Sequence, residues 1–333
     1  MREPAFWWRK PGLASALLAP AAACYGAVAA GRMARQGTGA GVPVVCVGNF
    51  TLGGSGKTPA VIAIAAMLQA SGERVFCLSR GYGGSASGPK EVDAHANRAA
   101  QVGDEALLLA RVAPTIVSRD RVAGVAAARA AGASVVLLDD GLQNGTLAKD
   151  FTLAVVDGRR GIGNGKVFPA GPLRAPLEAQ WARSDALLVV GEPRGAAAVV
   201  AAATARGKQI LYARLVADAA ALKALAGKRV LAFAGIGDPE KFFATVAAAG
   251  IEAPRRLSFP DHHRFSAEEA ASLLMQAEHD GLELLTTEKD HARMIGDPAL
   301  AALAESARVL PVTLQIDEAR ALRSLLLLTI RPD

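Results

Sequence analysis

Residues 42–59 read VPVVCVGNFTLGGSGKTP, and this stretch decides the fold. Its apolar first part predicts a strand over Val42–Val47, and the apolar-periodic run Ala60–Leu68 behind it predicts a helix. A glycine-rich turn between a strand and a helix is the context in which phosphate-binding P-loops occur. The glycines let consecutive backbone N–H groups point at phosphate oxygens, and the helix N-terminus adds partial positive charge. The stretch therefore predicts a nucleotide-binding α/β fold.

Six consecutive residues of this loop are expected to bind the nucleotide: Gly53, Gly54, Ser55, Gly56, Lys57 and Thr58. Lys57 can reach the β and γ phosphates, and the Thr58 hydroxyl can ligate Mg²⁺. The first glycine of the general G-x-x-x-x-G-K-[ST] pattern is replaced by Thr51, so Gly53 and Gly54 must supply the flexibility. A glycine-rich turn with a chance Gly-Lys-Thr is the alternative. The agreement between the loop and its flanks favours nucleotide binding.

The composition allows a large apolar core and an anionic partner. Of the 333 residues, 51% are hydrophobic and 20% are charged, and the formal net charge is +6. A basic surface suits a nucleotide, a phospholipid or nucleic acid. No RNA-binding signature or zinc-finger spacing is visible, so no nucleic-acid partner is expected. The three cysteines, Cys24, Cys46 and Cys77, form no C-x-x-C pair, which is typical of a reducing, cytosolic setting.

The first 36 residues combine aromatic, basic and weakly polar segments. Phe6–Lys10 reads FWWRK, and the run Pro11–Ala30 behind it is rich in Ala and Gly and is broken by Pro20. Paired Trp residues beside cations suit the headgroup region of a bilayer. Residues 1–36 are therefore predicted to form an amphipathic, membrane-associating helix that lies on the cytoplasmic leaflet. A bilayer span, a cleaved signal peptide and a core helix of the globular domain are the alternatives.

Short apolar runs alternate with helical patterns after residue 40, which indicates a mostly parallel sheet with helices on both faces. The predicted strands are Val42–Val47, Arg74–Leu78, Thr115–Val117, Ser134–Leu138, Thr152–Val156 and Ala186–Val190. The predicted helices are Pro59–Ala70, Asp104–Val112 and Arg121–Ala131. These elements are assigned to a P-loop core over residues 37–208, with the Ala-rich basic segment Gly195–Lys208 as its seam.

A second block, residues 209–333, is predicted to form a smaller C-terminal α/β lobe. Its strands are expected at Ile210–Leu215, Arg229–Ala234, Leu282–Thr286 and Val309–Leu314. Its helices are expected at Pro239–Ala248, with Asp238 as N-cap, at Ala267–Glu278 and at Asp317–Thr329. A cleft between the two lobes would then hold the ligand at the carboxyl ends of the parallel strands.

Acidic residues occur at two places where they could serve a phosphate site. The apolar run Ser134–Leu138 ends in Asp139 and Asp140, as a Walker B element does, so a carboxylate here is expected to hold Mg²⁺. Neighbouring carboxylates at a strand end point in opposite directions, so only one would face the metal. An Asp-Gly turn is the alternative. Asp104 and Glu105 open a helix, where acids also complement the helix dipole without any further function.

Two of the five histidines, His262 and His263, are adjacent in the segment Ser258–Phe265. Neighbouring side chains diverge and no third ligand is spaced nearby, so a zinc site is disfavoured. A histidine that accepts a proton or orients a carboxylate is the better interpretation. A helix start capped by Asp261 or Ser266 is an equally good alternative.

Two basic segments follow predicted strands and so lie at the same sheet edge as the P-loop. They contain Arg80 and Tyr82 in the first, and Arg119 and Arg121 in the second. Arginine at such an edge can fork onto phosphate oxygens. Ordinary surface charge explains these residues equally well.

Taken in order along the chain, these motifs closely resemble those of one family, tetraacyldisaccharide 4′-kinase, the lipid A 4′-kinase of Gram-negative bacteria. The motifs are Phe6–Lys10, Val47–Pro59, Ser79–Gly83, Gly103–Glu105, Asp139–Gln143, Phe168–Arg174, Ala234–Gly237, Phe259–His263 and Thr287–Asp290. Each is weak alone, and their joint order over nearly the whole chain is specific. Thr51 agrees with this family, where a small hydroxyl residue is usual.

The resemblance implies a kinase that transfers the γ-phosphoryl group of ATP to the 4′-hydroxyl of a lipid-linked glucosamine disaccharide, with 37–208 as the kinase core. By the family pattern, Asp104 would accept the hydroxyl proton, His262 would pair with it, and Lys57 would carry charge on the transferring group. The metal ligands would come from Thr58, Glu105, Asp139 and Asp140. The substrate-binding residues would be Asn49, Arg80, Tyr82, Arg119, Arg121 and Gln143.

The resemblance also implies a peripheral enzyme on the inner face of the inner membrane, and we expect a monomer. Its partners would be ATP, the lipid A disaccharide precursor and the membrane surface. The alternative function is a membrane-associated P-loop ATPase or GTPase switch that acts on a protein partner. GTP use is disfavoured because Thr287–Asp290 lacks the order of the guanine-binding Asn-Lys-x-Asp motif.

Overall fold

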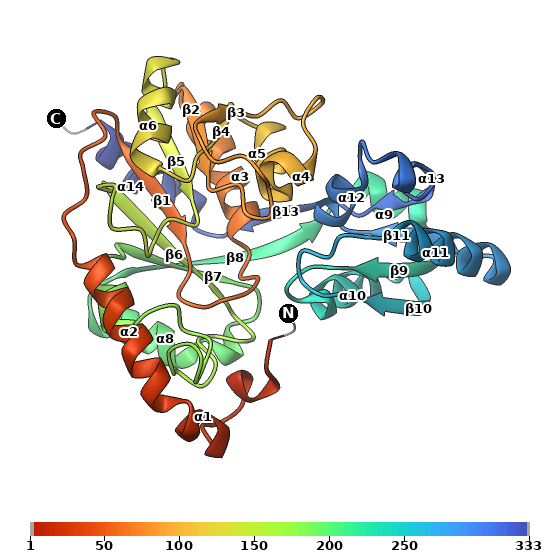
Figure 1. Cartoon of the computed structure of the whole chain (residues 1–333), viewed down its shortest axis with the longest axis horizontal. Helices are drawn as coiled ribbons and strands as arrows, with labels where there is room; N and C mark the ends of the chain where they lie inside the picture. Colours follow the sequence, from red (N-terminus) through yellow and green to blue (C-terminus); the bar gives the residue numbers. More distant parts are fainter. Residues whose placement is uncertain (1–2, 332–333) are drawn as a thin grey trace.

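A nine-stranded sheet forms the larger lobe of the computed structural model, which describes residues 3–331 (Figure 1). The strand order is β13-β8-β7-β6-β1-β5-β2-β4-β3, and all neighbours are parallel except β13 with β8 and β3 with β4. The strands are β1 (Val44–Gly48), β2 (Val75–Ser79), β3 (Lys90–Glu91), β4 (Thr115–Val117), β5 (Val135–Asp139), β6 (Phe151–Asp157), β7 (Ala186–Val190), β8 (Gln209–Ala217) and β13 (Val312–Ile316). The predicted parallel α/β sheet is thereby confirmed.

Helices cover both faces of this sheet, because successive strand residues point to opposite faces and both sets are apolar. On one face, side chains such as Val45 and Leu137 pack with α3 (Lys57–Gln69), α5 (Asp104–Ala110) and α14 (Ala319–Ile330). The other face packs against α2 (Ala19–Met33), α6 (Arg121–Ala130), α7 (Leu177–Trp181) and α8 (Ala197–Ala205). The short α4 (Ala99–Val102) precedes α5.

A four-stranded sheet of order β10-β9-β11-β12 forms the smaller lobe, with every neighbouring pair parallel. Its strands are β9 (Arg229–Ala234), β10 (Glu252–Ser258), β11 (Glu283–Thr286) and β12 (Arg308–Val309). Its helices are α9 (Ala219–Leu225), α10 (Pro239–Ala248), α11 (Ala267–Asp280), α12 (Glu288–Met294) and α13 (Ala301–Ser306). The smaller α/β lobe predicted from the sequence is therefore present.

The passage between the two lobes differs from the predicted boundary at 208/209. Both β8 and β13 belong to the larger sheet, and the predicted seam contains α8, which packs on that sheet. The predicted strand Val309–Leu314 is two strands, because β12 ends at Val309 and β13 begins at Val312 in the other sheet. Pro311 lies between them and has no N–H to continue a ladder. The chain thus enters and leaves the smaller lobe through the antiparallel pair β8 and β13.

The N-terminal segment forms a 3₁₀ turn (Ala5–Trp8), α1 (Leu13–Leu17) and α2, which lie along the larger lobe (Figure 1). Trp7 was expected to face the headgroup region of a bilayer. It is instead buried in the protein, and its Nε1 donates to the Pro169 carbonyl at 3.0 Å. The run Pro11–Ala30 is divided as predicted at Pro20, because α1 ends at Leu17 and Pro20 stands in the first turn of α2, where proline is tolerated. Within residues 3–331, no helix is both long and apolar enough to cross a membrane.

Candidate active site

The P-loop connects β1 to α3 and has the backbone that phosphate binding requires. Gly53 and Gly56 have φ angles of 89° and 93°, a region that glycine enters without strain. Gly56 is the N-cap of α3, and the helix begins at Lys57, two residues before the predicted start at Pro59. The N-terminus of α3 thus stands directly behind the glycines, where its N–H groups and dipole favour an anion.

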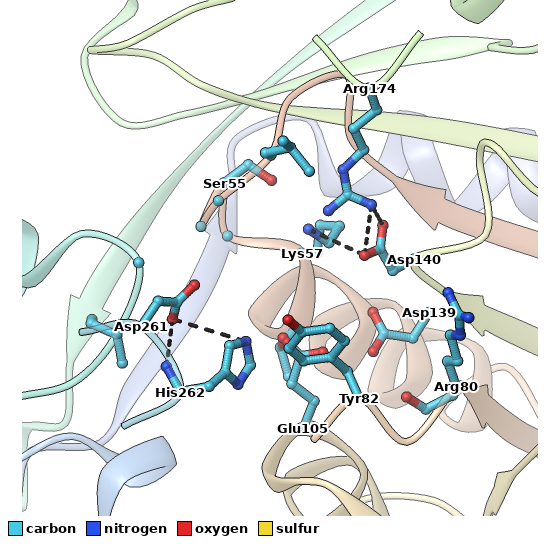
Figure 2. Close-up of a pocket in the computed structure, with 18 of the residues that line it drawn as sticks. Ser55, Lys57, Arg80, Tyr82, Glu105, Asp139, Asp140, Arg174, Asp261 and His262 are labelled. Atoms are coloured by element: carbon cyan, nitrogen blue, oxygen red, sulfur yellow. Dashed lines mark hydrogen bonds and ion pairs between the residues drawn. The ribbon is translucent and has the colours of Figure 1, made fainter. Parts of the chain in front are cut away.

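A cavity of about 1150 Å³ opens beside the P-loop and receives residues from both lobes (Figure 2). The larger lobe contributes residues 52–59, the carboxyl ends of β2, β4 and β5, and one side of α2. The smaller lobe contributes residues 236–238, Asp261, His262 and the beginning of α12. Phosphate-binding backbone and the two lobes therefore meet at one hollow, as the predicted cleft required.

The adjacent carboxylates at the end of β5 have opposite surroundings (Figure 2). Arg174 Nη1 donates to both oxygens of Asp140, at 2.8 and 2.9 Å, and Lys57 Nζ lies 3.8 Å from Oδ2. Burial alone would raise the pKa of Asp140, but Arg174 and Lys57 hold it well below its usual range. Asp140 has a φ of 54°, which is rare outside glycine and typical of functional sites.

Asp139 is buried, and neither of its carboxylate oxygens has a hydrogen-bond partner. Burial raises its pKa to about 7, and the charges of Glu105 and Asp140 add to this effect. A buried carboxylate without a donor is costly unless a cation approaches it. The surroundings of Asp139 therefore fit a divalent cation better than those of Asp140, which already has cationic partners.

Thr58 and Glu105 lie beside each other on the same side of the cavity. The Thr58 hydroxyl donates to Glu105 Oε1 at 3.3 Å, and Lys289 Nζ donates to the same oxygen at 2.7 Å. Among residues 3–331, no group of three or more His, Cys, Asp or Glu side chains is arranged to hold a metal alone. Oxygen ligands from Thr58, Asp139 and the nucleotide itself suit Mg²⁺, which usually keeps only one or two carboxylates.

The two lobes meet at Asp104 and His262, as the family resemblance implied. His262 Nδ1 lies 3.4 Å from Asp104 Oδ2, and the His262 ring lies 4.8 Å from that of Tyr82. Burial lowers the pKa of His262, but the Asp104 carboxylate more than offsets it and the net pKa is raised. His262 has a φ of 54°, so the backbone bends sharply to bring its ring to Asp104.

His263 takes no part in this cluster. Its Nε2 lies 3.0 and 2.9 Å from the Glu269 oxygens, and its ring stacks on Phe259. Ser266 caps α11 with Glu269 as the reciprocal partner. The segment after β10 therefore contains both a site histidine and a helix start, and the two interpretations considered from the sequence both apply.

The remaining predicted residues divide into cavity-lining and supporting ones. Arg80, Tyr82, Arg119, Arg121 and Gln143 line the cavity. Arg121 is nevertheless buried, and it donates to the carbonyls of Ser118 and Asp139.

Asn49 does not line the cavity, in contrast to the prediction that it contacts substrate. It is fully buried, and its amide donates to the Thr51 carbonyl at 2.7 Å. Gln143 Nε2 in turn donates to the Asn49 carbonyl at 2.8 Å. Asn49 therefore stabilises the conformation of the P-loop, because its short amide side chain donates to the backbone carbonyl two residues further on.

Several charged residues of the site have no role in the sequence-based prediction. They are Arg174, Lys289, Asp290 and Arg293, and the first three lie inside motifs that carry the family resemblance. Arg293 lies three residues beyond Asp290 on α12 and reaches Asp104 across the lobes. A cation in a short helix has no spacing signal of its own, and only the docking of α12 on α5 reveals its partner.

A P-loop at the edge of a parallel sheet, facing a carboxylate at the end of the next strand, defines the class of P-loop nucleotide-binding proteins. Comparison with known proteins specifies the family. The model for "Tetraacyldisaccharide-1-P 4'-kinase" matches residues 14–331. The tetraacyldisaccharide 4'-kinase of Nitrobacter winogradskyi is 54% identical over 98% of this chain and 97% of its own, and that of a Methylobacterium species is 56% identical over 99% and 98%.

A solved structure of LpxK from Aquifex aeolicus in complex with ATP is similar over 95% of this chain and 99% of that chain, with a TM-score of 0.73 and 25% identity. The chain belongs to the tetraacyldisaccharide 4′-kinase family.

Proposed function

We propose that this chain transfers the γ-phosphoryl group of ATP to the 4′-hydroxyl of a tetraacyl glucosamine disaccharide 1-phosphate, a step of lipid A biosynthesis. The observation that carries the proposal is the shared cavity. It joins the P-loop, the His262 that pairs with Asp104, and one side of α2 in a volume of about 1150 Å³. The phosphoryl donor ATP, the proton-accepting carboxylate and the amphiphilic lipid substrate can come together only where these three parts of the protein meet.

The donor phosphates would lie on the N–H groups of the P-loop and the N-terminus of α3, with Lys57 against the γ-phosphate. Burial lowers the pKa of the Lys57 ammonium, and the nearby Asp140 favours its charged form. Arg174 and Lys57 share Asp140, which holds the lysine at the base of the cavity. Mg²⁺ bound by Asp139 and Thr58, with Glu105 close by, would neutralise phosphate charge.

Asp104 is the proposed proton acceptor. Burial alone would raise its pKa, but His262 and the cations of α12 hold the pKa well below its usual range, so the carboxylate is ionised. A sugar hydroxyl is a poor acid, so the carboxylate mainly orients it and takes the proton late in the transfer. Closure of the lobes over this pair would exclude water from the γ-phosphate.

The acceptor is an amphiphile, and the N-terminal helices offer it a surface. Leu13 and Leu17 on α1 are 85% and 82% exposed, and the basic residues Arg9 and Lys10 lie just before them. Apolar side chains beside cations suit an anionic bilayer surface. We place the protein peripherally on the cytoplasmic face of the inner membrane, as a monomer, with α1 and α2 next to the lipid.

The test is phosphoryl transfer from γ-labelled ATP to a purified disaccharide lipid 1-phosphate in detergent micelles. We expect labelled lipid from the wild type, and a loss of roughly 10²–10⁴-fold in kcat for Asp104→Ala and for Lys57→Ala. Transfer that ceases with EDTA and returns with Mg²⁺ would support the metal assignment. ATP hydrolysis without any lipid label would contradict the proposal and favour a P-loop ATPase switch. Near-normal turnover of Asp104→Ala would contradict only the assignment of Asp104 as the proton acceptor and would leave the kinase function standing.

A further inference from the structure

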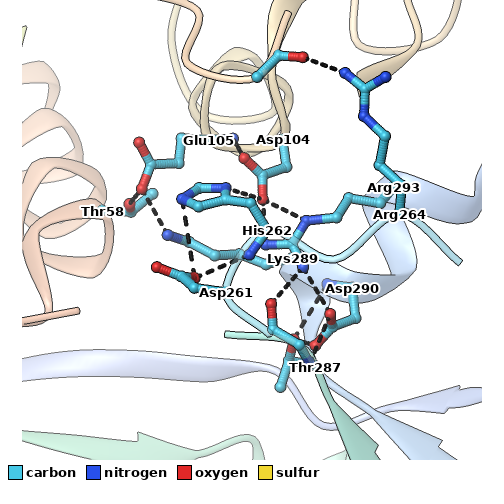
Figure 3. Close-up of polar contacts among 12 residues, drawn as sticks. Thr58, Asp104, Glu105, Asp261, His262, Arg264, Thr287, Lys289, Asp290 and Arg293 are labelled. Atoms are coloured by element: carbon cyan, nitrogen blue, oxygen red, sulfur yellow. Dashed lines mark hydrogen bonds and ion pairs between the residues drawn. The ribbon is translucent and has the colours of Figure 1, made fainter. Parts of the chain in front are cut away.

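The Asp104 carboxylate is held from several sides where the two lobes meet (Figure 3). Its side chain is only 3% exposed, and Oδ1 accepts a hydrogen bond from the backbone N–H of Glu105 at 2.9 Å. Oδ2 accepts from Arg293 Nε at 2.7 Å, and Arg293 Nη2 lies 2.5 Å from the same oxygen. His262 Nδ1 also approaches Oδ2. Arg293 and His262 therefore both approach Oδ2, whereas Oδ1 has a single hydrogen-bond donor.

We propose that Arg293 is a positioning residue for phosphoryl transfer, which holds Oδ2 of Asp104 so that Oδ1 meets the acceptor hydroxyl. An ionised carboxylate has about four acceptor positions, two on each oxygen. On Oδ2, Arg293 Nε takes one position and His262 Nδ1 approaches to 3.4 Å, and the Glu105 N–H takes one of the two on Oδ1. One position on Oδ1 remains for the hydroxyl. This inference rests on the proposed function, because that function makes Asp104 the proton acceptor.

The smaller lobe fixes the guanidinium of Arg293 before it reaches Asp104. Nη1 donates to the Gly235 carbonyl and to Asp290 Oδ1, both at 2.7 Å. Asp290 is fully buried and is held in turn by the Gly235 N–H at 3.0 Å and the Thr287 hydroxyl at 2.6 Å. These contacts leave Arg293 little freedom, so it can impose an orientation on Asp104 from across the interface.

Lys289, one turn earlier on α12, offers a useful contrast. It pairs with Glu105 at 2.7 Å and lines the cavity, so it could contact substrate directly. Arg293 is 6% exposed and does not line the cavity. Arg293 can therefore act on the reaction only through the groups it holds, which are Asp104 and, through the Gly235 carbonyl, the loop that precedes the cavity-lining Ile236. The planar fork of arginine makes several such contacts at once, which the single ammonium of lysine cannot do.

A double-mutant cycle tests this dependence, with Arg293→Met and Asp104→Asn measured singly and together in the lipid-labelling assay. We expect Arg293→Met to lower kcat about 100-fold, as a small misplacement of a reacting group does, and to change the KM for ATP by less than about twofold. In the Asp104→Asn background the same change should lower kcat by less than about twofold, because no carboxylate remains to be positioned. Arg293→Lys should recover part of the rate.

Arg160→Met is the matched control. Arg160 also joins the lobes, through Asp238 at 3.1 Å, and does not touch Asp104. If it affects kcat, the factor should be the same in both backgrounds, as expected for a residue that only stabilises lobe docking.

Equal effects of Arg293→Met in the two backgrounds would overturn the proposal and leave the lipid kinase function intact. A wild type that labels no lipid would overturn both. Removing one partner of a buried ion pair can prevent folding, so thermal unfolding is measured for each variant. If Arg293→Met does not fold, the cycle is run with Arg293→Lys, which retains the charge. A kcat equal to that of the wild type for a folded Arg293→Lys, with the Arg160→Met control also unchanged, would overturn a role that depends on the arginine fork.

Discussion

Two neighbouring aspartates, Asp139 and Asp140, have very different pKa values because their surroundings differ. Asp140 contacts Arg174 and Lys57, and its pKa is held low. Asp139 is buried beside the charges of Glu105 and Asp140 and has no hydrogen-bond donor, so its pKa rises to about 7. The sequence predicts that only one of the two faces a metal, but it does not tell which. The contacts favour Asp139, since a cation would satisfy oxygens that nothing else in the described chain satisfies.

Asp139→Asn should stabilise the metal-free protein in a pH-dependent way. The folded pKa of about 7 exceeds the ordinary aspartate pKa of 3.8, so the folded wild type binds a proton more tightly than the unfolded chain and loses stability as pH rises between these values. The advantage of the variant in free energy of unfolding should therefore grow by roughly 1–3 kcal/mol from pH 5 to pH 7.5, and level off above.

Urea unfolding in EDTA at several pH values measures this difference. A constant difference across that range would show that Asp139 is ionised in the folded protein throughout. The same variant should lose most of its phosphoryl transfer, since stability and metal binding make opposite demands on this carboxylate.

At the scale of elements, the N-terminal helices combine two tasks that the sequence suggests as alternatives. Met33 and Ala22 of α2 are buried against the larger lobe, as in a core helix. Leu13 and Leu17 of α1 are almost fully exposed, as in a membrane-contacting helix. Trp7 bonds the Pro169 carbonyl, so the aromatic start anchors these helices to the protein. The exposed leucines remain the part available to a bilayer.

Replacing Leu13 and Leu17 together by serine should weaken binding to vesicles that contain anionic phospholipid. Each leucine gains about 1.5–3 kcal/mol on full burial, so the partition coefficient should fall at least tenfold. Because both side chains are exposed, thermal unfolding should change little. Vesicle sedimentation measures the effect, with Met275→Ser, an exposed apolar residue of the smaller lobe, as control. Undiminished sedimentation of the double variant would place the membrane contact elsewhere.

At the scale of the whole molecule, ion pairs join parts that are far apart in sequence. Asp238, at the start of α10, pairs with Arg159 and with Arg160, the latter at 3.1 Å. Arg160 also pairs with Glu3 at 2.8 Å. Asp238 was expected as an N-cap, but its side chain makes no capping hydrogen bond because these arginines take it. The N-terminal segment and both lobes thus meet beside the P-loop.

Asp238→Ala should lower the free energy of unfolding by roughly 1–3 kcal/mol, because Arg159 loses its carboxylate partner and the partly buried Arg160 keeps only Glu3. The KM for ATP should rise, because the variant loses the ion pairs of Asp238 that join the smaller lobe to the larger lobe beside the P-loop. Asp280→Ala is the matched control, as it removes an ion pair with Arg255 on the outside of the smaller lobe. Urea unfolding and steady-state kinetics measure both, and equal effects of the two variants would contradict a special role for this junction.

The sequence by itself determined what depends on neighbours along the chain. An apolar run, three glycines and Lys57-Thr58 specify a strand, a turn and a helix, and short apolar strands specify a parallel sheet, because backbone geometry and burial act locally. Motif order specified the family. Only the tertiary structure decided that β8 and β13 return to the larger sheet and that Arg174 takes Asp140. It also decided that Arg293 holds Asp104 from 189 positions away. Such partners are chosen by packing between lobes, which leaves no periodic trace in the chain.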